Sequence, residues 1–295
     1  MLKRILIVVV LLSWGIVQAE EIKLKQGELT LNANLEKASG NWPAGPVVLL
    51  THGTLAHNGM EIITALQQLL LENDVSSLAL NLGLAVDDRH GMYDCKTPHR
   101  HHHTDALDEI GLWLGWLKQQ GAQNVVLLGH SRGGNQTAWF AAERDDPAIK
   151  QIVLIAPQTW DKDGDAADYE KRYAKPLAPV LAKARELVAQ NKGDTLLEKV
   201  DFIYCGDTAA TASAVVSYYN PEPRFDSIYL LPKIKKPVLV FVGSEDKVNE
   251  GLADRMAPVA EKEGVELVVI DGADHYFRDL YAEDLVDQVV EFIGN

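Results

Sequence analysis

Basic residues are scarce in this chain of 295 residues: 28 Lys and Arg stand against 42 Asp and Glu, giving a formal net charge of −14. Such an acidic chain repels phosphate backbones and anionic lipid headgroups, which argues against nucleic-acid binding and against adhesion to a membrane surface. The sequence also lacks an internal repeat, and its 47% hydrophobic content is sufficient for a sizeable core. A disordered or fibrous chain is therefore excluded, and one large domain or two modest ones are expected.

Long apolar runs are also lacking, except for one at the N-terminus. Lys3 and Arg4 precede 13 mostly apolar residues, and Val17-Gln18-Ala19 then places small residues where a signal peptidase acts. A membrane span needs about 20 apolar residues, so the run is too short to be a typical anchor. We therefore predict a signal peptide over residues 1–19 and an exported, periplasmic or secreted protein without a membrane anchor; a retained anchor is the alternative.

Cysteines are limited to Cys95 and Cys205, and neither belongs to a CxxC pair or lies at a strand-to-helix turn. A catalytic thiol is therefore disfavoured. In an oxidising compartment two cysteines tend to pair, so we predict a disulfide between them. Two separate buried thiols remain the alternative.

Short apolar runs alternate with amphipathic segments along most of the chain. Strands are predicted at 46–50, 77–82, 125–128, 152–155, 238–242 and 266–270, after a short antiparallel pair at 21–25 and 28–35. Helices are predicted at 61–73, 105–119, 136–143, 252–263 and 282–293. This alternation predicts an α/β fold with a mostly parallel, doubly wound sheet and helices on both of its faces.

A middle segment interrupts this alternation. Residues 160–236 hold a predicted helix at 180–190, a short strand at 200–204 and a helix at 209–219. We interpret this segment as a lid inserted between two strands of the sheet. The core would then consist of residues 20–159 and 237–295.

The most informative motif is Gly129-His130-Ser131-Arg132-Gly133, which lies directly between a predicted strand and a helix. A serine on such a tight turn is forced outward, and only small neighbours fit where the chain reverses. The backbone N–H groups that follow lie at the positive end of the helix. Ser131 is therefore the predicted nucleophile.

A serine hydroxyl needs a base to accept its proton. His275 follows the last predicted strand and is the candidate base. The loop after strand 238–242 offers Asp246 as the acid that orients this histidine, with Glu245 as its rival. The chain order Ser131, Asp246, His275 is the order found in one type of sheet enzyme.

The turn Thr51-His52-Gly53-Thr54 follows the first parallel strand. Acyl transfer develops a negative oxygen that needs backbone donors, and we assign the N–H groups of Thr54 and Arg132 to this oxyanion hole. The His52 side chain is expected to brace the loop through a hydrogen bond.

Together, the motif around Ser131, the His52-Gly53 turn, the loop ending in Asp246 and the final Asp274-His275 resemble the α/β-hydrolase superfamily. The resemblance extends from the first parallel strand to the C-terminal helix. It implies the α/β-hydrolase fold and a Ser-His-Asp triad, but it does not specify a substrate.

The chain departs from many relatives in the loop after strand 77–82. This loop runs from Asp87 through Cys95 to a histidine cluster at 99–103, and it is expected to shape the substrate pocket. We expect the histidines to form a solvated loop or a polar surface that faces the substrate. The Cys and His spacing of structural zinc sites is missing, which disfavours a metal. No phosphate loop or dinucleotide fingerprint is present, so no cofactor is expected.

These observations predict an exported serine hydrolase that cleaves a small-molecule carboxylic ester through an acyl-enzyme. A small serine peptidase or amidase is one alternative, and a non-catalytic, hydrolase-like binding protein is another. The acyl and alcohol groups of the substrate and the oligomeric state stay open.

Overall fold

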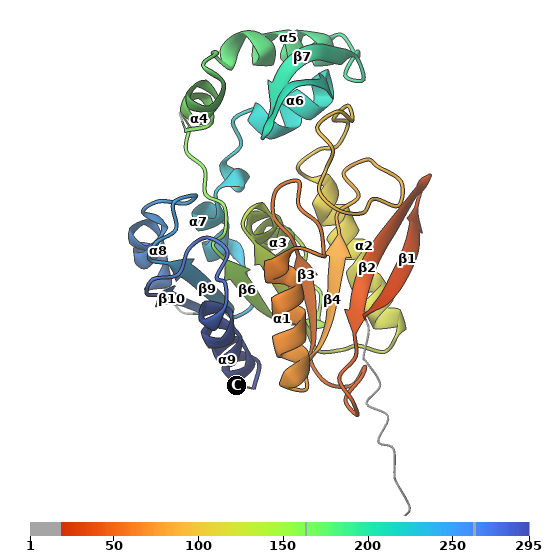
Figure 1. Cartoon of the computed structure of the whole chain (residues 1–295), viewed down its shortest axis with the longest axis vertical. Helices are drawn as coiled ribbons and strands as arrows, with labels where there is room; N and C mark the ends of the chain where they lie inside the picture. Colours follow the sequence, from red (N-terminus) through yellow and green to blue (C-terminus); the bar gives the residue numbers. More distant parts are fainter. Residues whose placement is uncertain (1–18, 163, 262–263, 295) are drawn as a thin grey trace, which may run out of the picture.

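The computed structural model describes residues 19–162, 164–261 and 264–294 (Figure 1). The predicted signal peptide, apart from Ala19, lies outside the described residues. In the described parts of the chain, no helix is both long and apolar enough to cross a membrane.

An eight-stranded sheet forms the centre of the molecule, in the order β1-β2-β4-β3-β5-β6-β9-β10. Its strands are β1 (Glu20–Gln26), β2 (Leu29–Glu36), β3 (Val47–Thr51), β4 (Ser76–Asn81), β5 (Val125–His130), β6 (Ile149–Ile155), β9 (Val238–Gly243) and β10 (Val265–Ile270). β2 pairs antiparallel with β1 and with β4, and all other neighbours pair in parallel. The predicted mostly parallel sheet is therefore confirmed.

Helices cover both faces of this sheet (Figure 1). Consecutive strand residues point to opposite faces, so Val48 and Leu50 pack in one apolar cluster whereas Val47 and Leu49 pack in the other. The first cluster includes α1 (Glu61–Glu72) and α9 (Leu280–Gly294); the second includes α2 (Asp105–Gln119), α3 (Arg132–Glu143) and α8 (Leu252–Ala260). Burial on both faces explains why these strands are continuous apolar runs in the sequence.

Most of the middle segment, residues 160–236, stands above the carboxyl ends of the parallel strands, and its last helical turns, at residues 223–233, pack beside α3 (Figure 1). We refer to the whole segment as the insertion. It contains α4 (Gly164–Tyr173), α5 (Ala178–Ala189), the hairpin of β7 (Leu196–Phe202) and β8 (Cys205–Thr211), α6 (Ala212–Tyr219), α7 (Ser227–Leu230) and the short 3-10 turns η1 (Pro223–Phe225) and η2 (Leu231–Lys233). Its apolar side chains, including Phe202 and Val215, join the same buried cluster as α2 and α3.

Secondary structure inside the insertion differs from the prediction at several places. The predicted helix 209–219 is wrong at its start, because Cys205–Thr211 pairs with β7 and α6 begins only at Ala212. The Thr211 side chain accepts a hydrogen bond from the Ala214 N–H and so caps this helix. The predicted strand 200–204 is displaced, because β7 begins at Leu196 and ends at Phe202. Helix α4 was not predicted because Tyr169 is its one buried residue.

Candidate active site

Ser131 occupies the sharp turn between β5 and α3, with φ 57° and ψ −123°. Glycine is required on both sides of it. A Cβ atom on Gly129 would lie 2.4 Å from the carbonyl oxygen of Gly133, and one on Gly133 would lie 2.2 Å from the carbonyl oxygen of His52. The backbone of Ser131 is held by β6 and its extension, since its N–H donates to the Ile155 carbonyl at 2.9 Å and its carbonyl accepts from the Gln158 N–H at 2.9 Å. The strained serine conformation is thus enforced by close packing.

Asp246 and His275 follow the neighbouring strands β9 and β10 and form a buried pair. His275 Nδ1 donates to Asp246 Oδ2 at 2.8 Å, and each residue is only 5% exposed. Asp246 Oδ1 accepts the backbone N–H groups of Val248 and Asn249 at 2.7 and 2.9 Å. Burial favours a higher pKa for the Asp246 carboxyl, but the hydrogen bonds from His275 and from these amides outweigh it and lower this pKa. The carboxylate therefore stays charged near neutral pH.

Glu245, the alternative acid, is exposed and pairs with a lysine. Its side chain is 61% exposed and lies 3.3 Å from the ammonium group of Lys247. Of the two neighbouring carboxylates, only that of Asp246 is hydrogen-bonded to His275.

His130 is a site residue that sequence reasoning missed. Its Nε2 donates to the backbone carbonyl of His275 at 2.9 Å, and the centres of the two rings are 4.9 Å apart. Burial lowers the pKa of His130 to about 4, so the ring is neutral and able to donate through Nε2 while Nδ1 is unprotonated. The sequence did offer a sign of this role, namely the position of His130 directly before Ser131. Because the elbow turns the serine side chain outward, the side chain of the preceding residue must point in a different direction.

The turn after β3 packs directly against the elbow. A Cβ atom on Gly53 would lie 3.1 Å from Ser131 Cβ, so the backbone around Thr54 approaches the serine closely. The predicted bracing role of His52 is confirmed, since its Nδ1 donates to the Gly53 carbonyl at 2.9 Å and its Nε2 accepts the Leu82 N–H at 3.0 Å. Burial and the nearby Arg89 lower the pKa of His52 to about 3, which keeps the ring neutral.

Arg89 holds the loop after β4 together and was also missed. The residue is 5% exposed, and its guanidinium donates to the carbonyls of Ala56, Leu82 and Gly91 at 2.8, 2.8 and 2.6 Å and to Asn81 Oδ1 at 2.6 Å. Ala56 belongs to the loop that contains the turn at Thr54, whereas the other acceptors belong to the end of β4 and the loop that follows it. Arg89 therefore fixes the turn beside Ser131 relative to the loop after β4.

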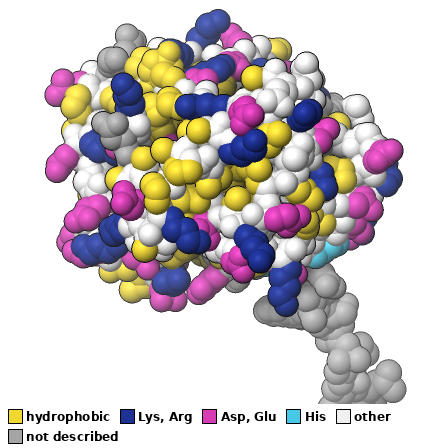
Figure 2. Space-filling model, turned by 90° about the horizontal axis from the view of Figure 1, so that it is seen from above, with side chains coloured by type: hydrophobic (Ala, Val, Ile, Leu, Met, Phe, Trp, Pro, Cys, Tyr) yellow, Lys and Arg dark blue, Asp and Glu magenta, His cyan; other side chains and the backbone are white. Residues whose placement is uncertain are grey.

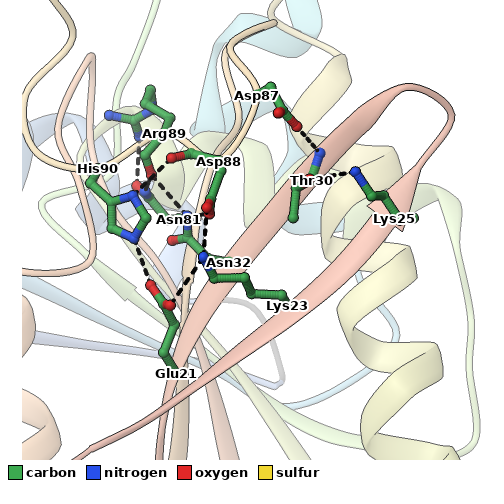
Figure 3. A network of polar contacts seen from close by, with 10 residues as sticks. All are labelled: Glu21, Lys23, Lys25, Thr30, Asn32, Asn81, Asp87, Asp88, Arg89 and His90. Carbon is green, nitrogen blue, oxygen red and sulfur yellow. Dashed lines mark hydrogen bonds and ion pairs between the residues drawn. The ribbon is translucent and has the colours of Figure 1, made fainter.

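The same loop is fastened to the edge of the sheet by charged residues (Figure 3). Asp88 pairs with Lys23 on β1 at 2.5 Å, and His90 Nε2 lies 2.6 Å from Glu21 Oε1. The Thr30 N–H donates to Asp87 Oδ1 at 2.6 Å. Exposed ion pairs of this kind contribute little stability individually, but these contacts join the loop to both β1 and β2.

Two arrangements were expected for the histidine cluster, a solvated loop or a polar surface facing the substrate, and the solvated loop is wrong. His99, His101 and His103 are each 0% exposed, and only a small area of histidine shows at the edge of the face seen in Figure 2. The insertion covers them: the His99 N–H donates to the Ala209 carbonyl and the His99 carbonyl accepts the Thr211 N–H, at 2.8 and 2.9 Å. Alternate residues of an extended segment share a side, so the three rings enter the core together.

The buried rings form hydrogen bonds among themselves and with the insertion. His99 Nδ1 lies 3.1 Å from His101 Nε2, and His101 Nδ1 lies 2.8 Å from the Tyr218 hydroxyl. Burial lowers the pKa of His99 to about 4 and holds those of His101 and His103 well below the usual value. Among the described residues, no three His, Cys, Asp or Glu side chains are grouped so that they could hold a metal ion.

Arg132 follows Ser131 and points toward the insertion. Its Nε donates to Thr54 Oγ1 at 3.0 Å and its Nη1 donates to His103 Nδ1 at 3.3 Å. The guanidinium carbon lies 5.2 Å from the centre of the Tyr218 ring, in a cation–π contact. The two residues chosen from the sequence for the oxyanion hole are therefore joined by a side-chain hydrogen bond.

The sequence profile of the alpha/beta hydrolase family matches residues 47–291, which is most of the chain. The chain belongs to this family. A relative in Mesorhizobium japonicum, 2-(acetamidomethylene)succinate hydrolase, is 24% identical over 282 residues, covering 90% of this chain and 92% of its own.

Solved structures resemble this alpha/beta hydrolase over nearly its whole length. Est1E from Butyrivibrio proteoclasticus has a TM-score of 0.62 at 21% identity and covers 92% of this chain and 97% of its own. A soluble variant of monoglyceride lipase from Saccharomyces cerevisiae has a TM-score of 0.63 at 15% identity, and the match covers 94% of this chain and 95% of the lipase chain. At these identities the structural likeness shows the fold, and it confirms the fold class expected from the sequence.

In this alpha/beta hydrolase a disulfide joins Cys95, in the loop after β4, to Cys205, the first residue of β8. Their Cα atoms are 5.3 Å apart, within the range of a normal bridge. The Thr208 hydroxyl adds a hydrogen bond to the Cys95 carbonyl at 2.7 Å. The pairing predicted from the sequence is thus present, and it links the loop to the insertion.

Proposed function

We propose that this protein is an exported serine hydrolase that cleaves a carboxylic ester of a small molecule through an acyl-enzyme. One observation supports this most strongly. Ser131 is held in the sharp turn after β5, and the buried His275–Asp246 pair lies in the loops after β10 and β9, at the same carboxyl edge of the sheet. The structural disulfide supports export, because such bonds persist in oxidising compartments.

In the proposed mechanism Ser131 Oγ attacks the ester carbonyl while His275 accepts its proton. Asp246 holds Nδ1–H, so Nε2 is left as the base, and its charge stabilises the imidazolium that forms. The backbone N–H groups of Thr54 and Arg132 stabilise the oxyanion. His275 then returns the proton to the leaving alcohol, and water hydrolyses the acyl-enzyme by the same steps.

The insertion would act as a lid over this site. Most of it stands above the carboxyl ends of the strands (Figure 1), and it is tied to the elbow at its base: the Gln158 N–H donates to the Ser131 carbonyl, and the Ser227 hydroxyl donates to the Gln158 carbonyl at 2.6 Å. The substrate pocket would therefore be bounded partly by residues of the insertion, which lies outside the sheet and helices that define the family fold.

Amide hydrolysis is the second candidate. The observation that favours it is the 24% identical relative named for the hydrolysis of 2-(acetamidomethylene)succinate. The same serine and histidine would act, with His275 giving its proton to a leaving amine.

A fluorophosphonate probe tests the nucleophile. We expect it to modify Ser131, and we expect Ser131→Ala to abolish both labelling and turnover. Ser39→Ala, at an exposed turn, is the matched control and should behave as the wild type. Nitrophenyl esters and aminoacyl nitroanilides then separate esterase from amidase. If Ser131→Ala keeps wild-type turnover, the mechanism is wrong. If neither substrate class is hydrolysed and no serine is labelled, the alternative of a non-catalytic binding protein replaces the proposed function.

A further inference from the structure

The Arg132 side chain is a positive charge without an ionic partner beside the proposed nucleophile. Across the described residues, no carboxylate oxygen lies within 4.0 Å of its guanidinium nitrogens. By contrast, Arg224 and Arg144 on neighbouring elements each pair with a carboxylate, at 2.8 and 2.6 Å.

Neutral groups hold this guanidinium in place. The Asn135 side-chain amide donates to the Arg224 carbonyl at 3.0 Å, so its oxygen faces His103 and accepts from His103 Nε2–H at 3.0 Å. His103 Nδ1 is then left unprotonated and accepts from Arg132. Thr54 Oγ1 and the face of the Tyr218 ring complete the surroundings. None of these groups neutralises the charge.

Several N–H groups of Arg132 stay available for a ligand. A guanidinium has five N–H donors, and within the described parts of the chain only Nε and Nη1 form hydrogen bonds, one each. The side chain is half-buried rather than fully solvated, which strengthens its attraction for an anion. Asp165 of the insertion is an acidic group that feels the charge of Arg132, which favours a lower pKa for its carboxyl. Its carboxylate is bonded elsewhere, to the Trp160 indole N–H at 2.6 Å, and burial raises its pKa overall.

We propose that the Arg132 guanidinium binds a carboxylate of the substrate, so that the preferred substrates are esters or amides with a free carboxylate near the bond that is cleaved. This inference rests on the proposed hydrolase function and names its substrate class. A planar guanidinium matches a carboxylate in a two-bond arrangement. Because the net charge of the protein repels anions, a local positive group next to Ser131 is the feature such a substrate needs.

Matched substrates test the proposal. Mono-4-nitrophenyl adipate is compared with its methyl ester, and 4-carboxyphenyl acetate with its methyl ester, so that the carboxylate lies on the acyl side in one pair and on the alcohol side in the other. We expect the carboxylate form to have a kcat/KM about 10- to 100-fold higher on at least one side, after subtraction of spontaneous hydrolysis. In Arg132→Gln this preference should disappear, whereas Arg132→Lys should retain part of it.

Arg255→Gln is the matched control, since it removes one positive charge from α8, where Arg255 is exposed and donates to Thr159 Oγ1 at 2.8 Å. It should keep the wild-type preference. A lack of preference in the wild type, or a preference that survives in Arg132→Gln, would overturn the proposal. If the wild type hydrolyses none of the four substrates and no serine is labelled, it is the proposed function that fails. The preference is a ratio, so a general loss of activity in Arg132→Gln does not mimic the expected result.

Discussion

Replacing Asp246 by Asn tests the proposed mechanism at the point where the structure defines it best. Asp246 Oδ1 accepts two backbone N–H groups, from Val248 and Asn249, and a carbonyl oxygen is needed at that position. In Asp246→Asn the amide oxygen would therefore stay there, and the amide NH₂ would replace Oδ2 and face His275 Nδ1. An NH₂ group cannot accept a hydrogen bond from Nδ1–H, so His275 would place its proton on Nε2 instead.

A histidine with its proton on Nε2 cannot accept the proton of Ser131. We therefore expect kcat to fall by about 10⁴-fold, as it does when the orienting carboxylate of a serine triad is replaced by an amide. That loss corresponds to about 5.5 kcal/mol of transition-state stabilisation. The hydrogen bonds to Val248 and Asn249 are retained, so the variant should fold and unfold cooperatively like the wild type.

The assay is steady-state hydrolysis of a nitrophenyl ester, together with the rate at which a fluorophosphonate labels Ser131. Both rates should fall in Asp246→Asn. Glu245→Gln is the control because its carboxylate is exposed beside Lys247, and its kcat should stay within about twofold of the wild type, since surface changes of this kind have small effects. An Asp246→Asn enzyme that retains a tenth of the wild-type kcat, or a larger loss in Glu245→Gln, would refute the assignment.

Two further predictions concern stability and the insertion. Glu109 on α2 is buried and accepts the Gly83 N–H at 2.9 Å, and burial raises its pKa from 4.5 to about 8. The folded protein therefore favours the protonated carboxyl, so the stability that Glu109 contributes is complete below pH 4.5 and is lost as the pH rises toward 8. Glu109→Gln should remove this loss, and its advantage in unfolding free energy over the wild type should grow by about 2–3 kcal/mol between pH 5 and pH 7 in urea titrations; a constant difference would contradict the burial effect. The Cys95–Cys205 bond closes a separation of 110 residues, so Cys95→Ser/Cys205→Ser should lower the unfolding free energy by up to roughly 4–5 kcal/mol. Because the bond joins the loop to the insertion rather than to the elbow, KM should rise in this variant more than kcat falls, and equal changes in both would argue against a role in the pocket.

The core of the fold could be predicted because its strands are buried on both faces. Val47 to Leu50 and Val125 to Leu128 are continuous apolar runs, and such runs are typical of a covered parallel sheet. The elbow was predictable for a similar reason, since close packing permits only glycine at positions 129 and 133. These constraints are local in the sequence, and a single chain displays them.

The histidine segment was not predictable, because what buries it comes from more than 100 residues away. His101 depends on Tyr218 and His99 on the backbone of Ala209 and Thr211. A polar run without a visible partner resembles a solvated loop until the insertion is placed on it. Arg89 escaped notice in the same way, since backbone carbonyls satisfy its guanidinium and a sequence does not show where carbonyls point.

The contacts between the loop after β4 and the insertion make one structural module from two separate stretches of sequence. A covalent bond, a pair of backbone hydrogen bonds on His99 and a set of buried rings all cross the same boundary. Replacement of residues 160–236 alone by the insertion of another hydrolase would leave Cys95 without its partner and would expose three neutral imidazoles to water. Any change of specificity that proceeds by exchanging the insertion must therefore carry the loop with it, and the two stretches are expected to vary together while the sheet beneath them stays the same.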